Sequence, residues 1–530
     1  RPGQARPSSS RSAAVMAAGT TLSRLSGFAR LLAVAWALGQ GSLSDAYNQA
    51  NTVPNTIYEL LLGGVLSATL LPVFMQSLSR PANDDEDAVP AVTTFLTVFL
   101  VAATLLFWLA APVIIDFYFL AKHPGPQTTA EEALAKDWLR LFTPQLLFMG
   151  LITITTALLN AKRRFGSVAF SPILANVVTI VALVVADHLL PHGTVGSYLQ
   201  RTSAIAVVGI GTTAGYLAQL IAQVPALLRS GVPLRPRWYP RHPAMVTIAR
   251  LSGWTVGAVL ANQVSFTLVT ILFLVSGGNY SAFSYAYAFV LLPHAVLAVS
   301  ISYAVAPDLA ELWSSGDTGG FGARTSQAMR ATTAFILPAG VGYALVASPV
   351  VVIALAHGNF APQSAHLTSQ LLSICALGLP GFSLYLLLMR AFQAKQDTRS
   401  MFWLYVLENT ITIALALALY PYFGARGLTA AWIGSYTVAL PFAWARLRRS
   451  ADLSVRGLWW ARILAATAAM AAATWAVLQA VPASHVIVWS AARLCLVVAV
   501  GGTAFTFSAR CLGVAELDGL AARLRSVLSR

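Results

Sequence analysis

Long runs of apolar residues, separated by short polar or charged stretches, recur along almost the whole chain. A membrane-spanning helix needs about 20 mainly apolar residues, and such runs repeat from Val15 to Phe507. The runs lack the ten-residue segments of alternating polarity that are typical of a transmembrane β-barrel. Because a helix satisfies its own backbone hydrogen bonds in lipid, the pattern predicts an all-α polytopic membrane protein.

The spacing of the apolar runs predicts about fourteen transmembrane helices. The first six are expected at residues 14–38, 48–76, 90–117, 135–160, 168–189 and 203–228. The other eight are expected at 244–276, 281–305, 328–356, 364–394, 400–421, 427–447, 458–481 and 486–509. Amphipathic stretches at 309–313 and 517–528 predict two further helices that lie on the membrane surface.

Two sequence echoes predict an internal duplication. The segment RLSGF at 24–28 recurs as RLSGW at 250–254, and seven residues between Ala161 and Ile180 recur at constant spacing between Ala394 and Ile413. Both echoes pair a helix with the sixth helix after it. They predict six-helix lobes at 1–230 and 231–450, related by a parallel repeat, and two additional helices with a cytoplasmic amphipathic tail at 451–530. Parallel repeats are typical of transporters, which bind substrate between the repeats and alternate access by rocking one against the other.

Composition excludes a soluble protein and charge predicts the topology. Hydrophobic residues make up 57% of the chain and charged residues 10%, whereas soluble domains have about a quarter charged residues. The net charge of +15 would favour nucleic-acid binding in a soluble protein, but here the basic residues gather in alternate loops. The opposite loops contain only Lys122, Lys136, Arg201 and Arg426. The positive-inside rule therefore predicts a plasma-membrane protein with both termini in the cytoplasm, and the basic residues do not indicate a nucleic-acid partner.

The chain has no motif typical of an enzyme. HExxH, GxSxG and Walker sequences are absent, and Cys375, Cys495 and Cys511 form no CxxC pair. His294 follows Pro293 within an apolar run, where we interpret it as a hydrogen-bonded packing residue. We expect no catalytic residue, no metal site and no cofactor.

Two arginines in the first predicted helix are candidate ligands of a diphosphate. Arg24 and Arg30 lie about 120° apart on an ideal helix, and Ser26-Gly27 between them permits a bend. Arginine suits a diphosphate because its planar guanidinium donates paired hydrogen bonds and keeps its charge. For Arg24, near the cytoplasmic end, the alternative is a side chain that extends to the membrane surface.

The second predicted helix begins with a run of polar residues that a lipid-facing helix would not tolerate, so one face must contact water or protein. Glu59 follows this run, and it either pairs with Arg24, Arg30 or Arg250 or carries a coupling ion or proton. The residues that we predict to bind substrate are Arg24, Arg30, Asp45, Asn48, Asn51, Asn55, Glu59 and Arg250.

The same segments resemble a known family. LSRLSGFAR at 22–30, SDAY at 44–47 and VPN at 53–55 resemble the amino-terminal signature of the MurJ (MviN) family, with further matches at 159–165 (LNAKRRF), 169–172 (AFSP) and 391–397 (AFQAKQD). These are lipid II flippases of the multidrug/oligosaccharidyl-lipid/polysaccharide exporter superfamily. The resemblance implies fourteen helices, a central headgroup cavity formed by helices one, two, seven and eight, and a groove for the polyprenyl tail beside the last two helices. By residue match, Arg24, Arg30 and Asp45 correspond to polar positions that matter in the family.

This chain departs from the family pattern in its charges. Tyr58 and Gly63 stand where well-known Gram-negative members have arginine and glutamate, and Ala288 replaces a cavity arginine. Glu59 and Arg250 are available as substitutes. The Ala- and Arg-rich, Lys-poor composition favours a GC-rich bacterium such as an actinobacterium.

Together these observations predict a flippase that moves lipid II from the cytoplasmic to the outer leaflet by alternating access. Its expected partners are lipid II or a related polyprenyl-diphosphate lipid, membrane lipids and cell-wall synthesis proteins, with coupling to membrane potential or a monovalent cation. Three alternatives stay open: a flippase for another polyprenyl-diphosphate glycan, a drug/cation antiporter of the same superfamily, and a scaffold for cell-wall synthesis. The scaffold alone predicts that cavity substitutions are harmless.

Overall fold

The computed structural model describes most of the chain, all of it helical or connecting structure with no strand in the described part. The described residues are 8–63, 70, 74–75, 88–232, 235–275, 277, 279–454, 457–482, 487–514 and 516. Within these ranges, the side chains at 8–15, 17, 62–63, 244–252, 255 and 487 are left undescribed.

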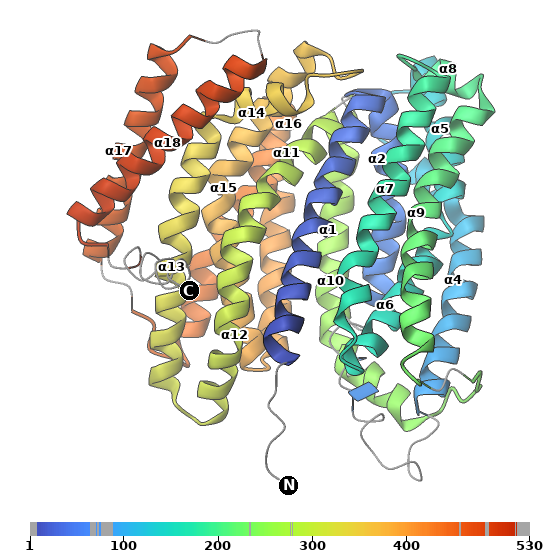
Figure 1. The fold of residues 1–530 in the computed structure, drawn as a ribbon, viewed down its shortest axis with the longest axis horizontal. Helices are drawn as coiled ribbons and strands as arrows, with labels where there is room; N and C mark the ends of the chain where they lie inside the picture. Colours follow the sequence, from blue (N-terminus) through green and yellow to red (C-terminus); the bar gives the residue numbers. More distant parts are fainter. Residues whose placement is uncertain are drawn as a thin grey trace. The chain divides into compact units, whose positions relative to one another are not determined.

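The first of two compact units comprises Arg1–Ser281 together with Gly358–Phe360. Within it, the long central helices α1 and α9 pack on either side of α7, and α5 packs against α2 and α4 (Figure 1). The elements of this unit are α1 (Ser8–Leu38), α2 (Ser42–Tyr58), the π-helical turn η1 (Glu59–Gly63), α4 (Ala88–Phe119), α5 (Pro126–Phe142), α6 (Gln145–Ala161), α7 (Phe165–Leu189), α8 (Val195–Leu199), α9 (Thr202–Leu228) and α10 (Pro243–Val275).

The second unit comprises Ala282–His357 and Ala361–Arg530. Helix α15 packs against α13, α14 and α16, and the α17–α18 pair packs against α13. The elements are α11 (Asn279–Pro293), whose first turn belongs to the first unit, the π-helical turn η2 (His294–Ala298), α12 (Val299–Ser314), α13 (Thr318–Leu345), α14 (Ala347–Leu355), α15 (Pro362–Ala394), α16 (Thr398–Arg448), α17 (Gly457–Ala480) and α18 (Ile487–Cys511). The predicted lobe boundaries at 230 and 450 stay predictions.

The prediction of about fourteen membrane helices is confirmed. Among the described residues, ten helical segments are long and apolar enough to cross a membrane, and eleven when α13 and α14, bent by 69°, count as one span. The more polar α1, the α2–η1 segment and a second arm of α16 bring the number to about fourteen. The region expected to continue α2 as far as residue 76 falls mostly outside the described residues.

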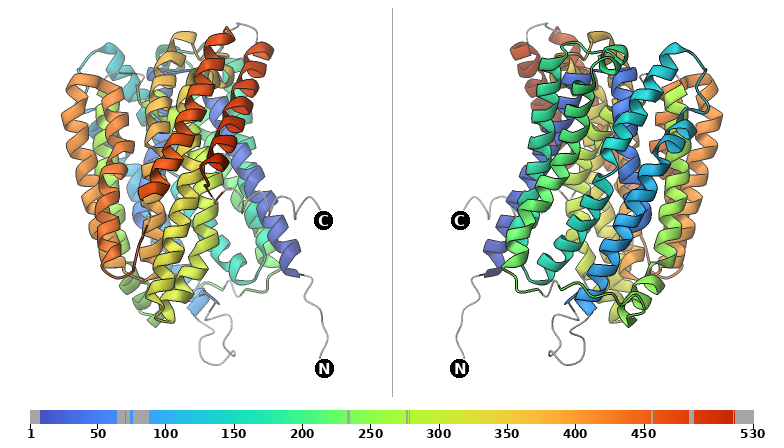
Figure 2. Two further views of the ribbon diagram at one scale, coloured as in Figure 1. Left: turned by 90° about the vertical axis from the view of Figure 1, so that its left-hand side faces the viewer. Right: turned by 90° about the vertical axis from the view of Figure 1, so that its right-hand side faces the viewer.

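Helix α16 is two antiparallel helices joined at Gly424. A straight helix of 51 residues would be about 76 Å long, far more than the roughly 30 Å hydrocarbon core. Gly424 instead has φ 53° and ψ −131°, a conformation that a residue without Cβ adopts easily. The Ser435 hydroxyl donates to the Glu408 carboxylate at 2.9 Å, so the two arms lie side by side (Figure 2). This agrees with the helices predicted at 400–421 and 427–447.

Two predicted boundaries were wrong. The stretch at 309–313 is the last part of a continuous segment, Asn279–Ser314, and does not form a separate surface helix. Pro293 lacks a backbone N–H, and the π-helical turn that follows it absorbs the defect, so the helix continues. The helix expected from residue 328 begins at Thr318, because the Asp317 carboxylate caps it by accepting from the Gly320 N–H at 2.7 Å. The stretch at 517–528 lies outside the described residues.

Close contacts with α7 hold α1 and α9 in place within the first unit. The Asn176 side-chain amide donates to the Ser26 hydroxyl at 2.9 Å, which links α7 to α1. On the other side of α7, any Cβ at Gly215 of α9 would meet the Ala175 carbonyl oxygen. Glycine therefore permits this approach, and α7 holds α1 and α9 at fixed distances.

Candidate functional site

The two candidate arginines of α1 have different surroundings. Arg24 is exposed, whereas Arg30 is half-buried. The residues of α1 that face α7, including Gly19 and Ser26, lie on the same helical stripe as Arg30. The 120° separation expected from sequence therefore sends Arg30 into the first unit and leaves Arg24 at its surface.

Arg30 is surrounded by two tyrosines. Its guanidinium lies near the Tyr216 hydroxyl of α9 and the Tyr47 hydroxyl of α2, and it interacts electrostatically with both. The Tyr47 hydroxyl contacts the Thr212 hydroxyl at 3.4 Å, and its ring packs edge-on against Trp138 at 5.8 Å. Aromatic packing thus fixes the tyrosine that accompanies the cation, so α1, α2 and α9 position Arg30 together.

Helix α2 has one closed face and one open polar face. Asp45, Gln49, Val53 and Thr56 are buried, whereas Glu59, which begins η1, is exposed. The open face has helical spacing and carries half-buried polar side chains at Asn48, Asn51, Thr52 and Asn55. A polar stripe of this length would be costly against lipid. We therefore interpret it as a surface that meets water or a polar ligand. That Asn48, Asn51 and Asn55 bind substrate stays a prediction.

The amides on this stripe are partly engaged along the helix itself. The Asn48 side chain donates to the Ser44 hydroxyl at 3.1 Å, and Asn55 donates to the Asn51 carbonyl oxygen at 2.8 Å. The Thr52 hydroxyl accepts from Tyr280 at 3.0 Å. The bonds of Asn48 and Asn55 orient these two amides and leave their carbonyl oxygens as acceptors for a sugar or peptide headgroup. The side-chain oxygen of Asn51 is buried.

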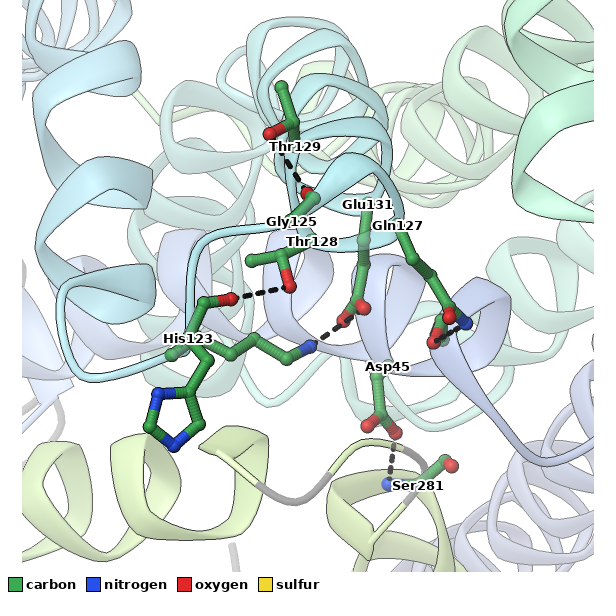
Figure 3. Close-up of polar contacts among 10 residues, drawn as sticks. Asp45, His123, Gly125, Gln127, Thr128, Thr129, Glu131 and Ser281 are labelled. Carbon is green, nitrogen blue, oxygen red and sulfur yellow. Dashed lines mark hydrogen bonds and ion pairs between the residues drawn. The ribbon is translucent and has the colours of Figure 1, made fainter.

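Asp45 lies on the closed face, where it caps another helix. The side chain has no exposed surface, and its carboxylate accepts from the Ser281 backbone N–H at 2.7 Å in the first turn of α11 (Figure 3). A carboxylate is stabilised at a helix N-terminus by unpaired N–H groups and by the helix dipole. The sequence predicted a substrate ligand here, but the geometry gives Asp45 a positioning role for α11.

A second polar cluster beside Asp45 fixes the α4–α5 connection. Lys122 and Glu131 form a buried ion pair at 2.7 Å, with side chains 8% and 1% exposed. Gln127 donates to the Ser42 hydroxyl at 3.4 Å, which joins the start of α5 to the start of α2 (Figure 3). Sequence reasoning counted Lys122 only as a loop charge, because a partner nine residues away gives no local helical signal.

Glu59 and Arg250 are placed only in part. Glu59 begins η1 and is exposed, and Arg250 lies in α10, but its side chain is not among those described. Their proposed pairing therefore stays a prediction. Of the eight predicted residues, the structure brings Arg30 to the start of α2 and sets Asn48, Asn51 and Asn55 on one stripe.

In the second unit, Glu408 and His294 are engaged locally. Glu408 is 2% exposed and accepts from the Thr412 hydroxyl at 3.0 Å and from Ser435 at 2.9 Å. His294 shares a hydrogen bond with the Ser383 hydroxyl at 2.9 Å and packs on the Phe382 ring. The arrangement of His294 agrees with the packing role expected from sequence.

An apolar groove runs between α13, α17 and α18 in the second unit. Its cavity volume is about 450 Å³, and its lining is almost entirely apolar, including Phe335, Met470, Val498 and Phe505. Gly502 widens it, because a Cβ there would meet no atom within 4 Å, whereas Gly501 lets α18 approach Thr474 of α17 closely. A groove of this shape and polarity fits a hydrocarbon chain.

Comparison with known proteins identifies the family. The family model described as "Lipid II flippase MurJ" matches residues 34–496, well over half of the chain. The chain belongs to the MurJ family. It is accordingly a multi-pass membrane transporter and lipid II flippase, and not an enzyme.

Similar proteins and solved structures cover most of the chain. A protein of Rhizobium meliloti named "Probable lipid II flippase MurJ" is 25% identical over 444 residues, covering 80% of this chain and 79% of the relative. The solved structure "Lipid II flippase MurJ, inward closed conformation" has a TM-score of 0.75 at 18% identity and covers 93% and 97% of the two chains. An inward-facing multidrug resistance MATE family transporter of the MOP superfamily has a TM-score of 0.64 at 13% identity and covers 79% and 94%. At these identities, the two structures establish a shared fold.

Proposed function

We propose that this MurJ family member moves lipid II from the cytoplasmic to the outer leaflet by alternating access, with the headgroup bound by the first unit. The observation that carries the proposal is the family match over residues 34–496. A transporter of this kind needs a polar surface for the sugar-peptide headgroup, a cation for the diphosphate and an apolar path for the tail. The described residues supply one candidate for each.

The diphosphate is assigned to the arginines of α1. Exposed Arg24 is free to reach a ligand, and Arg30 carries a second positive charge held by Tyr216. The amide stripe of Asn48, Asn51 and Asn55 contacts the headgroup, with Glu59 and Arg250 as further contributors. Asp45 acts indirectly, because its carboxylate is used by α11.

The polyprenyl tail is assigned to the groove of the second unit. Its lining lacks charged side chains, so it offers a hydrocarbon tail an environment like lipid. Transport then requires that the inward- and outward-open states differ in their affinity for the substrate or for a coupling ion.

The chain also needs an orientation in the membrane and a driving force for transport. The basic loops support an orientation with both termini in the cytoplasm of a bacterial cell and the chain in its inner membrane. Membrane potential or a monovalent cation supplies the driving force, without a further cofactor. Cell-wall synthesis proteins that produce or consume lipid II are the expected protein partners.

The proposal is tested by complementation of a strain depleted of its own lipid II flippase. The unmodified chain is expected to restore growth, and Arg24→Ala and Arg30→Ala to restore it poorly at equal expression. Each variant removes a charge-assisted hydrogen-bond donor, which contributes about 1.5–3 kcal/mol. Lipid II accessible at the outer face of spheroplasts gives the direct measurement.

Leu25→Ala is the matched control, because Leu25 neighbours Arg24 on α1 and is 57% exposed. It should rescue like the parent. Full rescue by both arginine variants would sink the diphosphate assignment. Failure of the unmodified chain to rescue, despite membrane insertion, would favour another polyprenyl-diphosphate glycan or a scaffold.

A further inference from the structure

A second cavity lies at the open end of the α16 hairpin, far along the chain from the candidate headgroup site. It has a volume of about 490 Å³ and is lined by both arms, with Arg399 and Trp403 on the first and Phe442, Arg446 and Arg449 on the second. Because the arms are antiparallel and turn at Gly424, their two free ends meet at one level. The loop charges predict that this level is the cytoplasmic surface.

The mouth of this cavity carries an excess of positive charge. Arg399, Arg446 and Arg449 are exposed, and among the described residues no ion pair engages them. Asp397 is the one acidic residue in the lining, so the three arginines and this carboxylate give the cavity a net charge of +2. Three guanidinium groups around one cavity favour a phosphate group, to which each can donate paired hydrogen bonds.

Asp397 is already used as a helix cap. Its carboxylate accepts from the Ser400 N–H at 3.1 Å at the start of α16. Partial burial opposes its ionisation, but the hydrogen bonds from Ser400 and the charges of Lys395 and Arg446 hold the pKa of Asp397 below its ordinary value. The carboxylate therefore stays ionised and fixes the first turn, so that Arg399 is presented at the mouth.

The lining changes from charged to aromatic to aliphatic along the hairpin. Arg399 and Arg449 lie at the free ends, Trp403 follows one turn further in with 56% of its side chain exposed, and Leu407 follows one turn beyond. On the second arm, Phe442 is 53% exposed. Eight residues from Arg399 to Leu407 span about 12 Å along a helix. A membrane leaflet changes in the same order with depth, from the headgroup phosphates through the interfacial layer where aromatic side chains gather to the acyl chains.

We propose that the open end of the α16 hairpin is a binding site for an anionic glycerophospholipid of the cytoplasmic leaflet. Arg399, Arg446 and Arg449 bind the headgroup phosphate, while Trp403, Leu407 and Phe442 contact the first carbons of the acyl chains. Free phosphate shares the chemistry of the headgroup but makes no use of the apolar half of the cavity. The diphosphate of lipid II shares it as well, so the experiment separates these three sources.

The test uses the full chain reconstituted in phosphatidylcholine vesicles that contain increasing fractions of brominated phosphatidylglycerol or brominated phosphatidylcholine. Bromine quenches tryptophan fluorescence on contact, and the difference between the parent and Trp403→Phe isolates the signal of Trp403. Brominated phosphatidylglycerol should quench Trp403 at a lower mole fraction than brominated phosphatidylcholine. Arg446→Gln and Arg449→Gln should each raise the half-quenching fraction about fivefold.

Arg448→Gln is the matched control, because Arg448 is exposed in the same turn but does not line the cavity. It should leave the half-quenching fraction within about twofold of the parent value, since its charge acts only from a distance. If Arg446→Gln fails to fold, as judged by its melting temperature, Arg399→Gln takes its place.

Three results would overturn the proposal. Equal quenching by the two brominated lipids, or an equal loss in Arg448→Gln, would mean that the cavity does not select an anionic headgroup. Reversal by millimolar inorganic phosphate would assign the site to the free anion. Displacement by lipid II at lower mole fractions than unlabelled phosphatidylglycerol would assign it to the transported substrate.

Discussion

Arg24 and Arg30 show how two identical residues on one helix acquire different tasks. Arg24 is exposed, whereas the guanidinium of Arg30 is held by Tyr216 and lies near Tyr47. Replacing Arg24 by lysine keeps a positive charge on a flexible, solvent-exposed side chain. A lysine at position 30 loses the planar group that donates in several directions at once.

We therefore predict that Arg24→Lys retains most of the rescue activity and that Arg30→Lys does not. The loss at position 30 should correspond to about 1.5–3 kcal/mol, the contribution of a hydrogen bond to a charged group. Growth rescue and thermal unfolding of the purified variants provide the two measurements. Indistinguishable behaviour of the two lysine variants would contradict the assigned difference in surroundings.

For single residues, the sequence predicted which polar side chains share a helix face better than it predicted what each side chain does. Helical spacing sets Asn48, Asn51 and Asn55 on one stripe of α2, and all three are half-buried. Their role in substrate binding stays a prediction. The role of Asp45 could not be read, because its partner Ser281 is 236 positions away. The Lys122–Glu131 pair was missed although its partners are only nine residues apart, because the connection between α4 and α5, and not the spacing of one helix, brings them together.

Among the elements, α11 depends on a side chain from another helix. The first N–H groups of a helix have no acceptor within the helix itself, and in α11 the buried Asp45 carboxylate accepts from the Ser281 N–H at 2.7 Å. The cap links α2 to the beginning of α11. A change at Asp45 should therefore loosen α11 at its start, without any direct contact with substrate.

We predict that Asp45→Ala destabilises the protein by about 1–3 kcal/mol, because it removes the carboxylate that accepts from the Ser281 N–H. Asp45→Asn should cost less, about 0.3–1 kcal/mol, because it loses the charge but keeps an acceptor. Hydrogen exchange of the Ser281 amide should accelerate by about tenfold or more in Asp45→Ala. Asp317→Ala is the control, since Asp317 caps Gly320 of α13, and it should accelerate exchange there instead. Unchanged exchange at Ser281 would refute the capping role.

The sequence predicted which segments form membrane helices. It predicted less accurately where each helix ends and where a helix breaks or continues. Apolar runs marked the membrane helices because lipid imposes a length and a composition on each span. The break in α16 was visible as a polar interval near Gly424. The continuity across Pro293 was not, because whether a proline breaks a helix or is absorbed by a π-helical turn depends on its neighbours.

For the whole molecule, lipid II transport should depend on the apolar groove of the second unit. At Gly502 a Cβ would meet no atom within 4 Å, so a larger side chain there extends into the groove without a clash in its first carbon. Gly502→Leu is expected to fold normally and to lower transport about tenfold, equivalent to about 1.4 kcal/mol of lost tail binding. Rescue of the depletion strain and the melting temperature are the measurements.

Gly434→Leu is the control for Gly502→Leu. Gly434 lies in α16, outside the groove, and a Cβ there also meets nothing within 4 Å. Both changes replace a poor helix former by a good one, so differences in rescue report on the groove alone. If Gly502→Leu rescues as fully as Gly434→Leu, the tail does not use this groove.

The interleaving of the two units has a consequence for biosynthesis. Gly358–Phe360 belongs to the first unit although it is flanked on both sides by the second. The Asn359 N–H donates to the Trp36 carbonyl oxygen at 2.8 Å, and its side chain donates to the Asp187 carboxylate at 3.1 Å. The first unit therefore cannot be completed until the ribosome has made α11 to α14 of the second. If a ribosome stalls before Gly358, the C-terminal end of α1 lacks its contact with Asn359. If the two halves were expressed as separate chains, the first unit would be divided between them.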